Sequence, residues 1–300
     1  MAIAVIFPGQ GTQTAHMGEP WRGSPAWEVV ERAETALGQP LAHLLLDATD
    51  ADLSRTREAQ LAVLLSSLLA WDAIRDVIDA PVAFAGHSLG QLTALIASGA
   101  LSLEDGVRLA VRRADCTQAT ADANPGRMAA MIGADLATAT EACAGVDAWV
   151  ANDNAPGQVV IGGTPSGVDA AKDRARELGV RRVIALNVGA AFHTPLMTAA
   201  ADALVPFLDV TCFSTPVAPI VSNADAVAYA GGDGWADRLA QHLISPVRWR
   251  SSMETLAGMG ADTFFEVGPG NVLAGLARRT VPAVTIRSVA VPTDALLEVA

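Results

Sequence analysis

The sequence predicts an α/β protein in which helices cover a parallel sheet and a smaller βαββαβ unit is inserted into the large domain. Strand-like and helix-like segments alternate through the first 120 residues, as they do in parallel sheets with helical connections. Between residues 127 and 189 the order changes to strand, helix, strand, strand, helix, strand. The chain has 300 residues, 51% of them hydrophobic, which is enough to bury a large core.

The large domain begins with an apolar strand. We expect a strand at 2–7, helices near 25–37 and 58–78, a strand at 81–86, and helices near 90–99 and 103–120. The first residues lack the charged region and the cleavage site of a signal peptide, and no apolar run approaches the roughly 18 residues of a membrane span. The sequence therefore predicts a cytoplasmic protein without a membrane segment.

The inserted unit has a regular order of its own. We expect strands at 128–133, 148–152, 158–162 and 182–186, with helices at 135–145 and 165–179. This order is typical of a ferredoxin-like subdomain of about sixty residues. The large domain would then be discontinuous, comprising residues 1–126 and 190–300, with the small subdomain at 127–189.

The chain returns to the large domain after the insert. Here we expect a helix at 195–208, a strand at 217–222, helices near 234–244 and 249–258, a strand at 263–267, a helix at 271–279 and a strand at 283–289.

Composition excludes several classes of function. The net charge of −12 argues against binding to nucleic acid or to an anionic membrane surface, because both require a positive surface. The cysteines Cys116, Cys143 and Cys212 are far apart and form no C-x-x-C pair. They indicate neither a disulfide framework nor a metal site, and we expect all three to be small buried side chains.

Ser88 is the candidate nucleophile. It lies in Gly86-His87-Ser88-Leu89-Gly90, after the apolar run 81–85 and before the apolar stretch 92–97. A serine at such a strand-to-helix turn is typical of a nucleophile elbow, where a Cβ at either glycine would obstruct the close approach of strand and helix. The alternative is an ordinary glycine-rich turn, because short G-x-S-x-G matches also occur by chance.

A nucleophilic serine needs a base, and His193 is the best placed histidine. It stands between a predicted strand and a predicted helix, on the sheet edge from which Ser88 would emerge. No Asp or Glu is placed as a third member, so a backbone carbonyl is expected to orient the ring. The remaining histidines have ordinary structural explanations; they are His16, His43, His87 and His242.

The glycine-rich loop 7–13 follows the first strand. Its sequence, FPGQGTQ, fits neither a Walker A loop nor G-x-G-x-x-G. The N–H groups of Gln10 and Leu89 would together form an oxyanion hole. The alternative is a tight turn that needs glycine for geometry alone.

Arg112 and Arg113 occur in an otherwise apolar helix. Neighbouring helical positions diverge by about 100°, so only one of the two can point into a given cleft. Solvated surface arginines are the ordinary interpretation, whereas an inward guanidinium would require a carboxylate or phosphate partner to offset its desolvation.

Ordered motifs extend over nearly the whole chain. They are FPGQGTQ at 7–13, GHSLG at 86–90, Arg113 with Gln118 five residues on, NAPGQVVIGG at 154–163, AFHTPLM at 191–197, SPVRW at 245–249 and FEVGPG at 265–270. With these motifs the chain resembles the malonyl-CoA:acyl-carrier-protein transacylases and the related acyltransferase domains of polyketide synthases. The resemblance implies an α/β-hydrolase-like large domain with an inserted ferredoxin-like subdomain.

The resemblance also implies catalytic roles. Ser88 would attack the thioester, His193 would act as base and then as acid with its ring held by a backbone carbonyl, and the Gln10 and Leu89 amides would bind the oxyanion.

Substrate-binding roles follow from the same resemblance. Arg113 would pair with the free carboxylate of malonate, the group that distinguishes this substrate from acetate. Phe192 resembles the malonyl-selecting variant, whose bulk leaves little room for an α-substituent. Asn154 and Gln118 would be further substrate-binding residues.

Two positions depart from the family pattern. Gln91 stands where the family usually has Glu after GHSLG, and Arg113 is followed by 114–116, Ala-Asp-Cys, where a glycine and apolar residues are more usual. The first departure would affect only hydrogen bonds behind the site, whereas the second bears on how Arg113 is oriented.

The resemblance implies a ping-pong transfer in which malonyl-CoA acylates Ser88 and the phosphopantetheine thiol of an acyl carrier protein then accepts the malonyl group. No cofactor or metal is expected, and the protein would be a monomer. One alternative is a discrete trans-acting acyltransferase or an editing acyl hydrolase of a polyketide-type assembly line, acting on a different acyl group. Another is a scaffold with an idle site, which the presence of Ser88, His193 and Arg113 together argues against.

An acidic carrier protein would need a basic docking patch on this acidic chain. Two clusters of arginines are candidates: Arg174, Arg176, Arg181 and Arg182, or Arg248 and Arg250.

Overall fold

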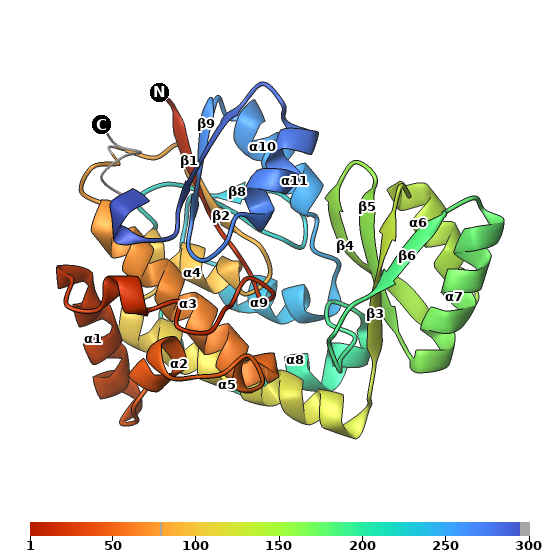
Figure 1. The fold of residues 1–300 in the computed structure, drawn as a ribbon, viewed down its shortest axis with the longest axis horizontal. Helices are drawn as coiled ribbons and strands as arrows, with labels where there is room; N and C mark the ends of the chain where they lie inside the picture. The colour runs from red at the N-terminus through yellow and green to blue at the C-terminus, as the bar shows by residue number, and fades with distance from the viewer. Residues whose placement is uncertain (79, 295–300) are drawn as a thin grey trace.

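The computed structural model describes residues 1–78 and 80–294, which form two lobes, each built on its own sheet (Figure 1). The large sheet has the strand order β10-β9-β1-β2-β7-β8, and the small sheet has the order β4-β5-β3-β6. The predicted combination of a helix-covered parallel sheet with a separate small sheet is therefore confirmed.

The strands of the large sheet are parallel to their neighbours except for the last pair, β7 and β8. They are β1 (Ile3–Phe7), β2 (Ala83–Gly86), β7 (Ile220–Val221), β8 (Ala228–Tyr229), β9 (Thr263–Val267) and β10 (Thr285–Val289). The strand expected at 217–222 is reduced to two residues, and β8 was not expected.

Helices cover both faces of this sheet (Figure 1). They are α1 (Glu28–Leu37), α2 (Ala42–Leu46), α3 (Thr56–Ile74), α4 (Gly90–Ala97), α5 (Leu103–Ala123), α8 (Thr198–Leu208), α9 (Trp235–Ile244), α10 (Trp249–Gly258) and α11 (Val272–Thr280). Short 3-10 turns lie at η1 (Glu19–Trp21), η2 (Pro25–Trp27), η3 (Asp52–Ser54) and η4 (Pro195–Met197).

The pleat of β1 explains why its sequence is apolar at every position. Successive side chains of a strand point to opposite faces. Val5 and Phe7 join the core beneath α3, α4 and α5, whereas Ala4 and Ile6 join the core beneath α10 and α11. With both faces covered, all five residues of the strand are buried, as expected for a central parallel strand.

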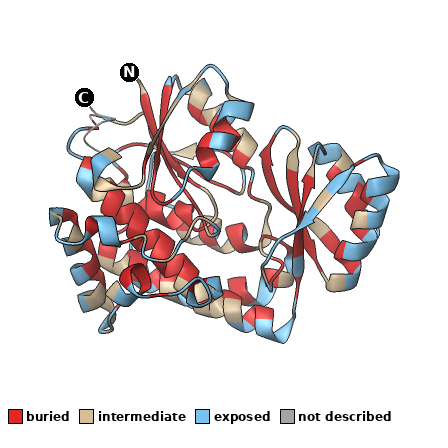
Figure 2. Cartoon of the chain, viewed as in Figure 1, coloured by how far each residue is buried: buried red, intermediate tan, exposed pale blue. Residues whose placement is uncertain are grey.

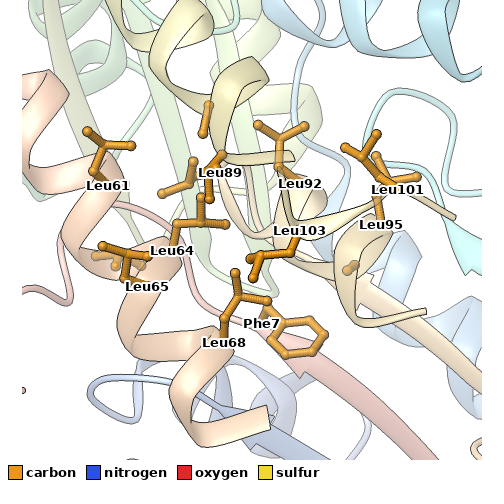
Figure 3. Close-up of a cluster of buried hydrophobic side chains, with 14 of the residues drawn as sticks. Phe7, Leu61, Leu64, Leu65, Leu68, Leu89, Leu92, Leu95, Leu101 and Leu103 are labelled. Carbon is orange, nitrogen blue, oxygen red and sulfur yellow. The ribbon is translucent and has the colours of Figure 1, made fainter. Parts of the chain in front are cut away.

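The turn that carries Ser88 rests on the larger of these cores. Leu89 follows Ser88 directly and Leu92 lies one helical turn further on, and both pack among the leucines of α3 and the ring of Phe7 (Figure 3). The segment that follows the nucleophile is therefore fixed by buried side chains.

The small lobe is antiparallel throughout. Its elements are β3 (Arg127–Ile132), α6 (Leu136–Cys143), β4 (Ala148–Ala155), β5 (Gln158–Gly163), α7 (Pro165–Glu177) and β6 (Arg182–Ala185). The order of elements and the strand order fit the expected ferredoxin-like unit. The exact domain boundaries, 126/127 and 189/190, stay a prediction.

The two faces of the small sheet have different neighbours. Met131 and Ile161 point to α6 and α7, whose outer surfaces are exposed to solvent (Figure 2). Met128 and Val160 point to the opposite face, where Phe192 packs against them. One face of the small sheet is thus available to line a cavity between the lobes.

Contacts of β4 with the segment 247–250 help to join the lobes. A backbone bridge pairs Asn152 with Val247, and the carboxylate of Asp153 accepts hydrogen bonds from Arg250 on α10. The wall of the cavity is therefore attached to the large lobe at the level of α10.

The cysteine prediction was wrong in part. Cys143 is buried, but Cys116 is half-buried and Cys212 is exposed. Cys212 follows α8, where the chain runs over the surface before entering β7. Over residues 1–78 and 80–294, none of the helices combines the length and apolar character needed to cross a membrane.

Candidate active site

Ser88 occupies a strained turn between β2 and α4. Its φ is +52°, a value that L-residues seldom adopt. A Cβ at Gly86 would collide with the backbone of Gly90, and one at Gly90 would collide with the carbonyl of Phe7. The glycines are therefore required by close backbone approach, and the turn has the geometry of a nucleophile elbow.

Ser88, His193 and a backbone carbonyl form a hydrogen-bonded chain. Ser88 Oγ lies 2.7 Å from His193 Nε2, and His193 Nδ1 lies 2.8 Å from the carbonyl oxygen of His242. Because a carbonyl only accepts, Nδ1 carries the proton and Nε2 offers its lone pair to the serine hydroxyl. The arrangement is that of a nucleophile beside a general base.

His193 is held in its neutral form. The side chain is buried, and its pKa is lowered to about 3, first by desolvation and then by the positive charge of Arg113. The imidazole is therefore unprotonated at neutral pH, which is the state that a base requires.

The path by which His193 reaches Ser88 differs from the expectation. His193 does not follow a strand directly, because β6 ends at Ala185 and the following residues form an irregular segment. The strand belongs to the small sheet, and the chain must cross back to the large lobe before η4 begins. His242 does more than fill space, since its ring stacks on that of His193 with centroids 4.8 Å apart.

Arg113 points into the site, and Arg112 points away from it. Arg113 is 5% exposed and donates to Gln60 Oε1 at 2.6 Å and to Ser88 Oγ at 3.3 Å. Arg112 instead lies over the ring of Phe207 at 4.6 Å. The inward orientation, one of the two alternatives left by the sequence, is therefore the observed one.

The guanidinium of Arg113 has no acidic partner within the described part of the chain. Burial lowers its pKa to about 10, which still leaves it charged at neutral pH. A buried cation of this kind is costly unless an anion pairs with it. The site is therefore suited to a ligand that carries a carboxylate or a phosphate.

Two backbone amides are available beside Ser88. Among residues 1–78 and 80–294, neither the N–H of Gln10 nor that of Leu89 has a hydrogen-bond acceptor, and both residues line the cavity. The Ser88 N–H, by contrast, donates to Asn223 Oδ1 at 2.8 Å. A Cβ at Gly9 would collide with the carbonyl of His87, so loop 7–13 packs closely on the elbow.

A cavity of about 580 Å³ contains these groups, a size that suits a small-molecule ligand. Its walls come from loop 7–13, the elbow, the inner face of the small sheet and α11. They include the predicted site residues Gln10, Ser88, Leu89, Arg113, Asn154, Phe192 and His193.

Asn154 and Gln118 differ in their placement. Asn154 Oδ1 accepts from His87 Nε2 at 2.8 Å, and its residue lines the cavity. Gln118 does not line it, and its amide donates to Asp122 at 2.7 Å. Five residues along a helix turn the side chain by about 140°, so Gln118 cannot share the inward direction of Arg113. The substrate-binding role expected for Gln118 is therefore withdrawn.

Two polar side chains at the site were missed from the sequence: Gln60 holds Arg113, and Asn223 holds the Ser88 amide. Gln91, which the sequence marks as a departure from the family pattern, accepts from the Asn223 amide at 3.0 Å, a hydrogen bond behind the site as expected. Gln60 lies in an apolar helical run, where a buried glutamine is an unexpected residue and was a usable signal. Within the described ranges, no group of three or more His, Cys, Asp or Glu side chains is placed to hold a metal ion.

Comparison with known proteins identifies the family. Residues 5–293 match the family model of the acyl transferase domain. The malonyl CoA-acyl carrier protein transacylase of Escherichia coli K12 is 36% identical over 97% of this chain and 96% of its own length.

Solved structures agree over the whole chain. An acyl-carrier-protein S-malonyltransferase from Burkholderia pseudomallei 1710b has a TM-score of 0.95 and 33% identity, covering 100% of this chain and 99% of its own. The malonyl-transacylase PlMCAT, solved with the type II PKS acyl-carrier protein AntF, has a TM-score of 0.95 and 30% identity with the same coverage. The chain therefore belongs to the acyl transferase domain family, in the group of the malonyl-CoA:acyl-carrier-protein transacylases.

Proposed function

We propose that this enzyme transfers a malonyl group from malonyl-CoA to the phosphopantetheine thiol of an acyl carrier protein through a malonyl-Ser88 intermediate. The observation that carries the proposal is the buried guanidinium of Arg113, which has no acidic partner among residues 1–78 and 80–294 and lies 3.3 Å from the Ser88 hydroxyl. A substrate that joins a carboxylate to a nearby thioester carbonyl satisfies both groups at once. The names of the relatives support the same substrate and acceptor.

The first half of the reaction uses the chain Ser88–His193. His193 Nε2 takes the hydroxyl proton while Oγ forms a bond to the thioester carbon. The N–H groups of Gln10 and Leu89 stabilise the negative oxygen that develops. Collapse breaks the carbon–sulfur bond, and the departing thiolate of coenzyme A recovers the proton from His193.

The second half repeats these steps with the carrier protein. The phosphopantetheine thiol gives its proton to His193 and attacks the malonyl ester, and Ser88 Oγ leaves with that proton. Arg113 would hold the malonyl carboxylate through both halves, as a planar fork matched to two carboxylate oxygens. Each step draws only on groups of this chain, so we propose that no cofactor takes part.

Docking of the carrier protein would involve exposed basic side chains. Arg250 is engaged by Asp153 and is a poor candidate, whereas Arg248 is exposed beside Val247, whose backbone pairs with the cavity residue Asn152. Arg174 and Arg176 lie on α7, on the face of the small sheet away from the cavity. We therefore favour the region around Arg248 for docking of the carrier protein. The monomeric state and the cytoplasmic location stay predictions.

Weighing the intact protein after incubation with thioesters tests the proposal. We expect malonyl-CoA to add one malonyl group, acetyl-CoA to add little, and the Ser88→Ala variant to remain unmodified. Methylmalonyl-CoA should load slowly, because Phe192 lines the cavity and its bulk is expected to leave little room for an α-substituent. Absence of any mass increase would contradict an acyl-enzyme mechanism.

A second stage distinguishes transfer from hydrolysis. Adding a phosphopantetheinylated carrier protein to the loaded enzyme should move the malonyl mass to the carrier. Release of free malonate without loading of the carrier would favour the editing hydrolase instead.

A further inference from the structure

Asn223 holds both sides of the nucleophile elbow. It follows β7, the neighbour of β2 in the large sheet. Its Oδ1 accepts from the Ser88 N–H at 2.8 Å, and its Nδ2 donates to the Gly86 carbonyl at 2.8 Å. Because one partner only donates and the other only accepts, the orientation of the amide is fixed. A single side chain therefore spans the turn from the residue before His87 to the nucleophile.

Asn223 is itself held in place through its backbone. Its N–H donates to Gln91 Oε1 at 3.0 Å, and its carbonyl accepts from the Arg248 N–H at 2.9 Å. Asn223 is 1% exposed and Gln91 is 2% exposed. Since Gln91 lies on α4 just after the elbow, the hydrogen bonds close a ring from the elbow through α4 and Asn223 back to Ser88.

The ring bears on the strained conformation of Ser88. A non-glycine residue at φ +52° persists only where its surroundings determine it. The bond from the Ser88 N–H to Asn223 is one such determinant, because it fixes the direction of the amide that the positive φ sets. The same bond removes this N–H from the cavity, whereas the Leu89 N–H has no acceptor in the part of the chain that the structure describes.

We propose that Asn223, supported by Gln91, is the positioning residue that sets the Ser88 hydroxyl against His193. The inference rests on the proposed role of Ser88 as nucleophile. Asn223 does not line the cavity, so it acts through the backbone of the elbow and not on the substrate. Its removal should slow the attack by Ser88 while leaving binding of the thioester almost unchanged.

The same ring of hydrogen bonds determines which side chains can replace Gln91. Only its Oε1 is used, because Nε2 is buried without a partner in the described part of the chain. The bond to Asn223 thus requires an acceptor and not an amide. We expect Gln91→Glu to keep the ring and Gln91→Leu to break it.

Substitutions at Asn223 test its two side-chain hydrogen bonds, to the Ser88 N–H and to the Gly86 carbonyl. Asn223→Asp keeps an acceptor for the Ser88 N–H but places an oxygen against the Gly86 carbonyl, and Asn223→Ala removes both bonds. Asn124→Asp is the matched control, since Asn124 is exposed at the end of α5.

The probe is a small fluorophosphonate that modifies nucleophilic serines. Ser88 Oγ forms a bond to phosphorus, fluoride leaves, and His193 takes the hydroxyl proton. This reaction does not need a carboxylate on the reagent, so it reports on Ser88 whatever the natural acyl group is. The rate is normalised to the folded fraction, measured by thermal unfolding.

Positioning predicts that labelling and the kcat of malonyl loading both fall about 10- to 100-fold in Asn223→Ala and Asn223→Asp, as a small misplacement of a reacting atom does. The KM for malonyl-CoA should stay within about 2-fold, because the cavity walls are unchanged. Gln91→Leu should follow the same pattern, and Gln91→Glu and Asn124→Asp should label at the wild-type rate.

Wild-type labelling rates in both Asn223 variants would overturn the inference, as would a fall that disappears after normalisation to folded protein. If labelling falls as expected but wild-type enzyme loads no malonyl group, the positioning role stands and the proposed acyl transfer fails. The two hypotheses are therefore distinguishable in one set of measurements.

Discussion

The guanidinium of Arg113 lies 3.3 Å from the hydroxyl oxygen of Ser88, at the same end of the cavity. The other terminal nitrogen of the guanidinium, Nη1, donates to Gln60 Oε1 at 2.6 Å, and this glutamine carries no charge. Cation and nucleophile are thus spaced for a ligand in which a carboxylate is close to the carbon under attack.

This spacing predicts a selective loss in Arg113→Ala. Leaving the malonyl carboxylate without its partner should cost about 3 kcal/mol, which lowers kcat/KM for malonyl-CoA roughly 100-fold. Acetyl-CoA has no carboxylate and should lose little. Initial rates of acyl loading with the two thioesters give the ratio, and equal losses would point to a purely structural arginine.

The pH dependence of Ser88 acylation follows from the low pKa of His193. The unprotonated ring is the active form, and a pKa of about 3 means that this form persists as the pH is lowered. We expect fluorophosphonate labelling to change little between about pH 5 and pH 8 and to fall only toward the pKa itself. An acid limb near the ordinary histidine value of 6.5 would contradict the assignment.

Replacing Arg113 should shift the pH at which fluorophosphonate labelling is lost. Arg113 lowers the pKa of His193 through its positive charge, although burial is the larger cause. Arg113→Gln should therefore raise the pKa of His193 and shift the loss of labelling to higher pH. The fluorophosphonate carries no carboxylate, so the comparison is free of substrate ionisation.

The raised pKa of Glu266 predicts that the free energy of unfolding depends on pH. Glu266 is fully buried in β9, and its two oxygens accept the N–H groups of Leu273 and Ala274 at the start of α11. Burial raises its pKa to about 7, above the ordinary value of 4.5, so the folded state keeps the proton where the unfolded chain has lost it. Stability should then fall as the pH rises from about 4.5 to 7, by up to about 3 kcal/mol.

Urea unfolding at a series of pH values checks this expectation against Glu266→Gln. The variant has no titrating group at this position, so the difference in unfolding free energy between the two proteins should change across the window. A constant difference would show that Glu266 does not titrate there. Because Leu273 lines the cavity, loosening of α11 should also raise the KM for malonyl-CoA.

The fold was predictable because its signals are local. The apolar run of β1 and the glycines around Ser88 each reflect constraints that act within a few residues: burial on both faces, and close backbone approach at the turn. The change in order after residue 127 likewise separated the small sheet from the large one.

The partners of the site were harder to predict because they are distant in sequence. His193 reaches Ser88 through an irregular segment, and Asn223 reaches it from a two-residue strand whose short pattern carries almost no signal. The residue pattern alone left open which of Arg112 and Arg113 faces inward, because the rotation of α5 depends on its packing against α1, α3 and α8. Only the resemblance to the family assigned that role to Arg113. The rotation of α5 also carries Gln118 away from the cavity.

The ion pair between the lobes gives a final prediction. Both Nε and Nη2 of Arg250 contact Asp153 Oδ2, at 2.9 and 2.8 Å, and the Asp153 side chain is only 7% exposed. Arg250→Met would leave a nearly buried carboxylate without its cation, which should lower the free energy of unfolding by about 2 kcal/mol. Arg176→Met is the matched control, because the ion pair of Arg176 with Asp173 is largely exposed and should contribute less than about 1 kcal/mol.

The same substitution should weaken substrate binding. Asp153 lies between Asn152 and Asn154, both of which line the cavity, so a looser β4 displaces that wall and raises the KM for malonyl-CoA. The double variant Asp153→Asn with Arg250→Met removes the unpaired charge and should recover part of the lost stability. Urea unfolding and loading kinetics of the four proteins measure both effects. If Arg250→Met unfolds at the same urea concentration as wild type, the ion pair does not hold the lobes together, and β4 is held by its other contacts, which include the backbone bridge to Val247 and the hydrogen bond between His87 and Asn154.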